Sequence, residues 1–504
     1  MTTPEERAGR GGSGQEATPH MGPAPRPVPR RHGRDVIRRR PRQTRVIDCP
    51  EPVEQSTFAT PIVHARRFAL AFILVILIGT LLLLAPWATA SGQSTDPYDA
   101  MFTAVSAASV TGLVTVNTST HWSFFGQLTI LALIQTGGLG FMVGASLVLA
   151  ILRRGGSLRD AMLMQDGSPT LTLREALDYS GQIVRFTAVV EATGATILTL
   201  YFWLGTGLSL QEALWNGVFH AVAAFCNAGF DLSDDFQSLV PYDQSVVVNV
   251  VIAGLIQAGA ISYIVFHDVW RSRSWTRLSL DSKLVLTINA VLVLGAAAVF
   301  LAVEWNASLA GTPGWARPMS AIFQSVAART AGFTTVNFGQ AATVTLLVWL
   351  GIMAIGGASG STAGGIKMTT VGVIVVAVVS ALRGNTDVHI FGRRLGAPLI
   401  FRAMAVIVLY MTIYFFVTMA LVISDGPLLE DRFSTAGLLF ESMSALATVG
   451  LTTGITPELS DAGKVILAIG MFLGRIGPLS FAYALQGRQH PPRFRYPEVP
   501  VRIG

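Results

Sequence analysis

The chain has 504 residues, of which 51% are apolar and only 13% are charged, and it contains apolar runs such as FALAFILVILIGTLLLLAP at 68–86. A soluble globular protein carries about 25% charged residues, whereas about 20 consecutive apolar residues are what a helix needs to cross a bilayer. The composition therefore excludes a soluble protein and predicts one that crosses a membrane several times. The cysteines, Cys49 and Cys226, lie in different contexts, so neither a disulfide framework nor a metal cluster is implied.

The net charge of +6 is concentrated at the N-terminus, because residues 1–67 hold 13 Arg against 7 Asp and Glu. This segment is rich in Pro and Gly and lacks apolar periodicity, so it is expected to be a disordered, Arg-rich cytoplasmic tail. Its basic stretch at 30–45 could bind nucleic acid or anionic lipid. A positively charged cytoplasmic flank of the first span is favoured, so no nucleic acid partner is expected.

The apolar runs predict an all-α integral membrane protein with eight transmembrane segments. The expected spans are 68–86, 124–152, 183–204, 246–266, 284–303, a broken span over 342–381, 399–423 and 463–485. Arg and Lys gather in every second connection, and Asp and Glu gather in the others. The excess of positive charge on the cytoplasmic side of membrane proteins then places both termini in the cytoplasm.

Each outer connection also contains a shorter, moderately apolar segment that ends in a glycine turn. The segments are DPYDAMFTAVSAASVTGL, SLQEALWNGVFHAVAAFCNAGF, RPMSAIFQSVAARTAGF and DRFSTAGLLFESMSALATVGL. Helix-starting residues stand at their beginnings, including Asp96, the pair Ser209 and Glu212, and Asp431. Segments too short to span are expected to enter the membrane and turn back, which is tolerated where irregular backbone lines a protected cavity.

The turn glycines recur at nearly constant spacing, which predicts four tandem span–pore-helix–span repeats around one pseudo-fourfold pore. One such glycine would indicate an ordinary turn, but four behind four short helices favour a common function. Glycines inside the following spans, such as Gly138, repeat as well. The expected organisation is a tail at 1–67, pore repeats at 68–152, 183–266, 284–381 and 399–485, and a cytoplasmic C-terminal tail at 486–504.

Four short helices aimed at one axis would direct their negative C-terminal ends toward it. The turns would supply backbone carbonyls that replace the hydration shell of a monovalent cation, and glycine allows the close approach. The predicted coordinating residues are Val110, Thr111, Gly112, Asn227, Ala228, Gly229, Thr330, Ala331, Gly332, Thr448, Val449 and Gly450. Asp231 is expected to attract cations at the outer mouth, while Asp234 and Asp235 fit that role and a solvated loop equally well.

The stretch GGASGSTAGGIK interrupts the broken span with small and polar residues. Close helix packing needs only one or two small residues per turn, so the stretch is predicted to leave helical geometry and to gate the pore. The proposed gate contains Gly356, Gly357, Ala358, Ser359, Gly360, Ser361, Thr362, Ala363, Gly364, Gly365, Lys367 and Arg475. Arg475 is expected to face the pore as a fixed positive barrier, or to pair with a carbonyl of this stretch.

RTAGF, GFTTVNFG, GGASGSTAGGIK, FLGRIGPLSF and the closing RYPEVPVRIG together resemble the Trk/Ktr/HKT superfamily of potassium transporters, most closely the bacterial Ktr membrane subunit. The resemblance implies K⁺ transport through a filter with one glycine per repeat. A glycine at position 112 is the K⁺-type pattern, whereas Na⁺-selective plant members carry serine there. It also implies a homodimer in membrane lipid, bound to a cytosolic RCK-type regulatory subunit that binds ATP or ADP, in the bacterial cytoplasmic membrane.

Several alternatives stay open or are disfavoured at this stage. The Ktr type is favoured over the Trk type because residues 1–67 lack two extra spans, and a dependence on Na⁺ as coupling ion is left open. A carrier with alternating access would show inverted repeats, which are not found here. An intramembrane serine protease could use Ser359 only with a histidine base, and His220 is expected nearer the outer side. No catalytic residues and no bound cofactor are expected.

Overall fold

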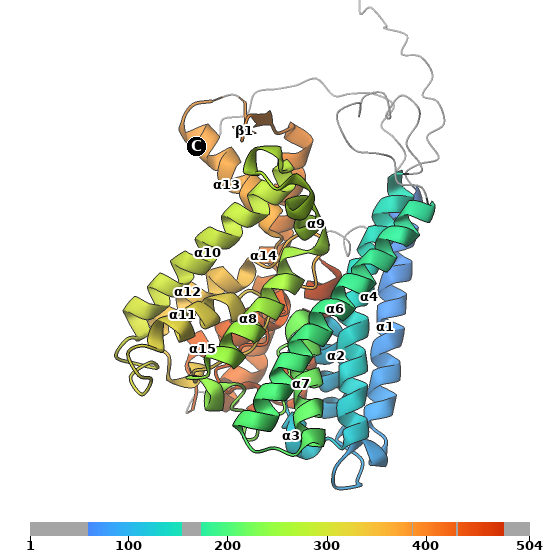
Figure 1. The fold of residues 1–504 in the computed structure, drawn as a ribbon, viewed down its shortest axis with the longest axis vertical. Helices are drawn as coiled ribbons and strands as arrows, with labels where there is room; N and C mark the ends of the chain where they lie inside the picture. Colours follow the sequence, from blue (N-terminus) through green and yellow to red (C-terminus); the bar gives the residue numbers. More distant parts are fainter. Residues whose placement is uncertain (1–58, 154–172, 386, 430–431, 478–504) are drawn as a thin grey trace, which may run out of the picture. The chain divides into compact units, whose positions relative to one another are not determined.

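The computed structural model describes residues 59–153, 173–385, 387–429 and 432–477. This part of the chain is mostly helical, and the described helices are shown in Figure 1. The expectations for the tail at 1–67, before Ala59, and for the tail at 486–504 fall outside the described residues.

The helices follow one another as a long helix, a short helix and then one or two further helices, and this order recurs along the chain. The first such stretch holds α1 (Ala59–Leu83), α2 (Pro97–Ser109), α3 (Thr118–His121) and α4 (Phe124–Arg153), and the second holds α6 (Leu173–Gly205), α7 (Leu210–Phe225), α8 (Val246–Ile261) and α9 (Tyr263–Ser272). The third holds α10 (Leu280–Glu304), α11 (Arg317–Ala327), α12 (Thr343–Ala354) and α13 (Met368–Leu382), and the fourth holds α14 (Ala397–Leu429), α15 (Thr435–Ala447) and α16 (Asp461–Ile476). Between α13 and α14, the strands β1 (His389–Ile390) and β2 (Arg393–Arg394) pair antiparallel.

Three of the described helices are long and apolar enough to cross a membrane, namely Ser180–Gly205, Leu280–Glu304 and Ala397–Leu429. A fourth crossing is possible if α8 and α9, which meet at an angle of 91°, form one bent span. Other apolar helices, including Thr343–Ala354 and Met368–Leu382, are shorter than a bilayer crossing requires. The structure thus supports a membrane protein, while eight crossings remain a prediction.

The second stretch differs from the sequence prediction, which had one continuous span at 246–266. The helix breaks at Ser262, whose φ of 77° and ψ of 141° are not helical. The carbonyl freed near the break accepts a hydrogen bond from another segment, because the Ala358 N–H donates to the Ala260 carbonyl oxygen at 2.8 Å. The Ser262 hydroxyl donates to the Gly360 carbonyl oxygen at 3.2 Å. Contacts with a distant loop therefore stabilise a break that no local pattern predicts.

Local sequence explains where the short helices begin. The Asp96 carboxylate accepts the Tyr98 N–H at the start of α2, and Ser209 and Glu212 form a reciprocal capping box at the start of α7. The fourth short helix was expected to start after Asp431, which lies outside the described residues. It starts instead after Ser434, whose hydroxyl accepts the Gly437 N–H.

The packing between consecutive stretches closes on itself. Helix α4 packs against α6 and α7, α8 packs against α11, α12 packs against α15, and α16 packs against α2. The buried apolar clusters follow the same pattern, since each of the three largest draws its residues from neighbouring stretches. The first and the last stretches of the chain are therefore neighbours in space.

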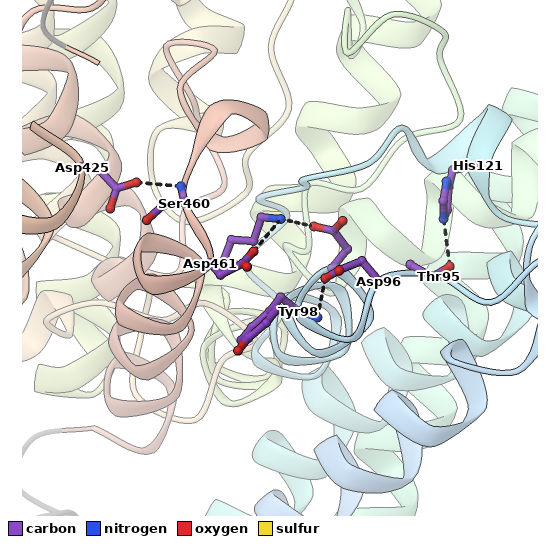
Figure 2. A network of polar contacts seen from close by, with 9 residues as sticks. Thr95, Asp96, Tyr98, His121, Asp425, Ser460 and Asp461 are labelled. Carbon is purple, nitrogen blue, oxygen red and sulfur yellow. Dashed lines mark hydrogen bonds and ion pairs between the residues drawn. The ribbon is translucent and has the colours of Figure 1, made fainter. Parts of the chain in front are cut away.

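A polar network joins these two ends at the beginnings of α2 and α16 (Figure 2). The Lys464 ammonium lies 2.7 Å from Asp99 of α2 and 3.6 Å from Asp461 of its own helix. The Asp425 carboxylate accepts the Ser460 N–H at 2.7 Å, just before α16. The ion pair between Lys464 and Asp99 therefore links segments that are 365 positions apart in the sequence.

Candidate functional site

The short helices α2, α7, α11 and α15 end in the same backbone conformation. In each case a residue in the left-handed region is followed two positions later by a glycine that also has a positive φ. The φ angles are 59° at Val110, 59° at Asn227, 65° at Thr330 and 51° at Thr448, and 93° at Gly112, 70° at Gly229, 75° at Gly332 and 93° at Gly450. A non-glycine residue in this region costs about 1 kcal/mol or more, so the repeated conformation indicates a functional constraint.

The four glycines are brought together around one point. A Cβ atom built on Gly112 would lie 2.8 Å from the Cα of Gly229, and one on Gly229 would lie 3.0 Å from the Cα of Gly332. Similarly, a Cβ on Gly332 would lie 3.1 Å from the Cα of Gly450, and one on Gly450 would lie 3.2 Å from the Cα of Gly112. The order of contacts therefore closes a ring, and any side chain at these positions would clash with its neighbour.

The carbonyl groups at this ring belong to the residues that the sequence singled out. A Cβ on Gly229 would lie 2.9 Å from the Ala331 oxygen, and one on Gly332 would lie 2.6 Å from the Val449 oxygen. A Cβ on Gly112 would collide with the Ala228 carbonyl oxygen, and one on Gly450 would collide with the Thr111 carbonyl oxygen. The predicted residues of the four turns are thus neighbours in space, and they are almost completely buried.

A cavity of about 610 Å³ opens beside the ring, and all four ring glycines line it. Asp231 and Asp235 line this cavity, as the sequence allowed, and so does Glu458, which the sequence analysis missed. Asp234 is not among the residues that line it, and its carboxylate accepts a 2.6 Å hydrogen bond from the Ser119 hydroxyl. Three carboxylates beside a ring of carbonyl oxygens favour cations over anions.

The protonation of Asp231 is sensitive to its surroundings. Burial raises the pKa of this carboxyl to about 6, although the N–H and hydroxyl of Ser233 and the hydroxyl of Ser238 favour the charged form. The Ser233 N–H donates to Asp231 at 2.9 Å. The charge at the mouth of the cavity therefore changes in the pH range just below neutrality.

Glycines in the later helices let the ends of the short helices approach closely. A Cβ on Gly137 would collide with the Ala108 carbonyl oxygen, and one on Gly259 would collide with that of Phe225. Gly474 has the same relation to Leu446. The glycine predicted for the first of these positions was Gly138, which packs against the Cys226 sulfur instead. The difference is one position, and a one-residue shift along a helix turns a side chain by about 100°.

The predicted gate is a loop between α12 and α13 that leaves helical geometry, as expected for ten consecutive small residues. Its two ends are held together, because the Gly356 N–H donates to Ile366 and the Ile366 N–H donates to Ala354, both at 2.9 Å. The backbone hydrogen bonds at the two ends therefore close the loop where it leaves α12 and enters α13. The buried residues of the loop are Gly356, Gly357, Ala358, Ser361, Thr362, Ala363 and Gly364.

The hydroxyl groups of the loop have different roles. The Thr362 hydroxyl donates to the Phe225 carbonyl oxygen at 3.1 Å and lies 3.2 Å from the Asn227 side chain, at the end of α7. The Ser361 hydroxyl donates to the Ala358 carbonyl oxygen at 2.7 Å, whereas Ser359 is exposed beside Thr369. Gly364 lies close to the last turn of α15, since a Cβ there would be 2.8 Å from the Ala447 oxygen. The loop thus contacts two of the four turns.

Two basic side chains donate hydrogen bonds to carbonyl groups of the loop. The buried Arg475 guanidinium of α16 donates to the Thr362 carbonyl oxygen at 2.5 Å and to the Gly137 carbonyl oxygen of α4 at 2.7 Å. The Lys367 ammonium donates to the carbonyl oxygens of Ala363 at 2.6 Å and Gly364 at 3.4 Å. Arg475 therefore links the loop to the first and fourth stretches of the chain.

The arrangement offers no support for a protease. His220 lies buried on α7, where its Nδ1 is 2.8 Å from the Asn216 carbonyl oxygen and its ring packs near Phe202 and Phe333. The Ser359 hydroxyl contacts Thr369 and not this histidine. Among the described residues, no group of three His, Cys, Asp or Glu side chains is arranged to hold a metal ion.

The comparisons with known proteins agree with this geometry. Residues 67–489 match the family model described as "TrkH: Cation transport protein". The chain is 39% identical to the Ktr system potassium uptake protein B of Bacillus subtilis, over 86% of this chain and 96% of that protein. It is 34% identical to the potassium/sodium uptake protein NtpJ of Enterococcus hirae, over 87% of this chain and 97% of that protein.

The fold also has a solved counterpart. The crystal structure of the potassium transporter TrkH from Vibrio parahaemolyticus superposes with a TM-score of 0.63 at 18% identity, over 82% of this chain and 84% of that one. At this identity the likeness concerns the fold alone, while the match to the family model covers most of the sequence. The chain therefore belongs to the TrkH family of cation transport proteins.

Proposed function

We propose that this chain is the ion-translocating subunit of a potassium-uptake system in the bacterial cytoplasmic membrane. The observation that carries the proposal is the closed ring of Gly112, Gly229, Gly332 and Gly450, which lines an acidic cavity and whose turns contact a buried loop. The names of the relatives, which are potassium or potassium/sodium uptake proteins, support K⁺ as the transported ion.

In this proposal the chain forms four span–pore-helix–span repeats that cross the membrane eight times. The repeats are those at 68–152, 183–266, 284–381 and 399–485, between a cytoplasmic tail at 1–67 and another at 486–504. The cyclic packing of α4, α8, α12 and α16 on the following short helices supports a pseudo-fourfold axis. Arg and Lys in alternate connections favour cytoplasmic termini.

The twelve residues of the four turns act as a selectivity filter. Their carbonyl oxygens replace water around K⁺, and the C-terminal ends of four helices add negative potential at the same point. Asp231, Asp235 and Glu458 raise the local concentration of cations in the outer cavity. K⁺ is here a transported ion and not a resident cofactor.

The loop at 356–365, with Lys367 and Arg475, acts as the gate beneath this filter. In the described conformation it is held by hydrogen bonds to α7, α8 and Arg475, so the structure corresponds to a closed state in this proposal. Opening requires that these bonds be exchanged for others, because a buried polar group without a partner costs about 1–3 kcal/mol.

Regulation is proposed from the Ktr-type relatives, whose names refer to a Ktr system and so imply a further component. We propose a cytosolic RCK-type subunit that binds ATP or ADP and acts on the gate, and a homodimer of this chain in the membrane. Dependence on Na⁺ is a separate property, which is tested by adding Na⁺ to the uptake assay.

The proposal is tested by complementation of a potassium-uptake-deficient bacterium at low K⁺, with wild type and Gly332→Ser side by side. We expect wild type to restore growth and Gly332→Ser to fail or to admit Na⁺, since the serine Cβ would lie 2.6 Å from the Val449 oxygen. Equal rescue by both proteins would contradict the assignment of Gly332 to the filter. Two results together would instead indicate a carrier with alternating access. Uptake would saturate at a low turnover rate, and the protein in planar bilayers would show no single-channel currents.

A further inference from the structure

A carboxylate is buried inside the fourth short helix, directly behind the turn that follows it. Glu441 of α15 is fully buried and accepts hydrogen bonds from the segment beyond Gly450. The Thr452 hydroxyl donates to it at 2.5 Å, the Thr453 N–H at 2.8 Å and the Thr456 hydroxyl at 2.8 Å. The side chain thus connects the helix before the ring to the backbone after it.

The third short helix has a neutral side chain that contacts its own turn in a similar way, although it precedes the turn glycine by eight positions and Glu441 precedes its glycine by nine. Gln324 of α11 is fully buried, and its amide donates to the Thr335 hydroxyl at 3.0 Å. The Thr334 hydroxyl lies 3.4 Å from the Gln324 carbonyl oxygen and donates to the Val336 carbonyl oxygen at 2.5 Å. Thr334 and Thr335 follow Gly332 by two and three positions, as Thr452 and Thr453 follow Gly450.

The first two stretches lack this connection in the part of the chain that the structure describes. Thr103 of α2 precedes Gly112 by nine positions, as Glu441 precedes Gly450. Its hydroxyl is buried and has no hydrogen-bond partner among the described residues, and the same is true of Thr115 beyond the turn. His220 holds the matching position in α7, and its Nδ1 faces a carbonyl of its own helix.

We infer that Glu441 and Gln324 are positioning residues that fix the backbone beyond the ring in the fourth and third turns, and that they contribute to the discrimination of K⁺ from Na⁺. The inference rests on the proposed filter function. Carbonyl oxygens select between two cations of equal charge only if their spacing is maintained. Side chains that fix the adjacent backbone on two of four sides would supply this restraint.

The chemistry of Glu441 fits this role better than a general electrostatic one. An ionised carboxylate is an acceptor only, and its two oxygens match the four donors from Thr452, Thr453 and Thr456. A glutamine would place N–H groups against donors. Hydrogen bonds to a charged acceptor are also roughly twice as strong as neutral ones, so this turn is the more firmly held of the two.

The test measures rubidium uptake into liposomes that contain the full chain, with competing K⁺ or Na⁺. The readout is the ratio of the Na⁺ and K⁺ concentrations that give half-maximal inhibition. We expect Glu441→Gln to lower this ratio about tenfold, equivalent to about 1.4 kcal/mol of discrimination. Thr456→Val keeps the charge and removes one donor, and we expect a decrease of about threefold. Gln324→Leu should act in the same direction.

Thr103→Val is the matched control, because it changes the equivalent position of α2 where the hydroxyl has no partner among the described residues. Its ratio should equal that of wild type. Variants are compared only when they elute and melt like wild type. If Glu441→Gln weakens inhibition by both ions equally and Thr456→Val has no effect, the role is electrostatic and the inference is wrong. Absence of uptake by wild type would instead contradict the proposed function itself.

Discussion

Arg475 of α16 and Thr362 of the α12–α13 loop are joined by a 2.5 Å hydrogen bond between the guanidinium and the carbonyl oxygen. The two residues are 113 positions apart, and a second bond from the same guanidinium reaches Gly137 at 2.7 Å. One buried cation thus holds the proposed gate against two other parts of the chain. Its removal would take away one of several bonds that hold the loop, together with the positive charge of the proposed barrier.

We therefore expect Arg475→Ala to raise K⁺ flux in liposomes, by about tenfold if the arginine bonds contribute about 1.4 kcal/mol to the closed state. Arg475→Lys retains the charge but cannot bond both carbonyls through a planar guanidinium group. Its flux should therefore lie between that of wild type and that of Arg475→Ala. The measurement is potassium efflux at a fixed gradient. Flux equal to or below that of wild type in Arg475→Ala would contradict a barrier at this position.

Shortening the loop tests the gate without substituting Arg475, and it also removes Thr362, whose carbonyl oxygen accepts one of the Arg475 hydrogen bonds. Deletion of residues 358–363 removes the bonds to α8 and α7 but leaves Gly356 and Ile366, whose backbone bond of 2.9 Å closes the base. We expect a more permeable protein that no longer responds to its regulatory subunit.

Ser359→Ala is the control for this deletion, because the Ser359 side chain is exposed and contacts only Thr369 among the described residues. Its flux should match that of wild type, a result that would also be incompatible with a serine protease. Unchanged flux after the deletion would count against gating by this loop.

The fold and the site could be predicted from the sequence to different extents. The caps at Asp96 and Ser209 could be predicted because these side chains accept free N–H groups at a helix start. The four turn glycines could be predicted because glycine readily adopts a positive φ. The break at Ser262 could not be predicted, since it depends on a bond between Ala358 and Ala260 that no local pattern encodes.

The sequence alone also could not show whether Gly137 or Gly138 lies against the end of α2. Two adjacent glycines offer the same flexibility, and only the packing of α4 on α2 distinguishes them. Glu441 could have been singled out from the sequence, because an acidic residue inside a short apolar helix is unusual. Its partners beyond the turn required the structure.

The ion pair between Asp99 and Lys464 should stabilise the protein, because both side chains are largely buried, at 16% and 12% exposure. Asp99→Asn and Lys464→Met should each lower the melting temperature in detergent. The double variant should be little worse than either single one, with a coupling of about 1–2 kcal/mol.

The exposed pair between Arg432 and Glu458, at 68% and 48% exposure, is the control for this cycle. Its coupling should be below about 1 kcal/mol. Additive effects of the Asp99 and Lys464 variants would show that their contact does not hold α2 and α16 together.

The raised pKa of Asp231, about 6 instead of the ordinary 3.8, predicts a pH dependence of uptake. The carboxylate is ionised at pH 7.5 and neutral at pH 5. The rate of uptake at low K⁺ should therefore decrease as the pH is lowered from 7.5 to 5. Because the folded protein holds this proton more tightly than the unfolded chain, the contribution of Asp231 to stability falls as pH rises from about 4 to about 6.

Asp231→Asn should therefore give low, nearly pH-independent uptake between pH 7.5 and 5, and should melt at a higher temperature than wild type at pH 7.5. Asp234→Asn is the control, since Asp234 bonds to Ser119 and does not line the cavity. It should keep the pH profile of wild type. An unchanged profile in Asp231→Asn would exclude this carboxylate as the source.

The packing of α4 on α2 predicts different outcomes for two glycines of α4. A methyl group on Gly137 would collide with the Ala108 carbonyl oxygen at the end of α2, whereas Gly140, three positions along the same helix, faces open space within 4 Å. Gly137→Ala must displace backbone that leads into the Val110 turn, so rubidium uptake should fall by an order of magnitude or more, about the effect of 1–3 kcal/mol of overpacking strain. Gly140→Ala should transport like wild type and, since alanine favours helix by about 1 kcal/mol, melt no lower. Equal uptake by the two variants would mean that the close approach of α4 to α2 is not required for conduction.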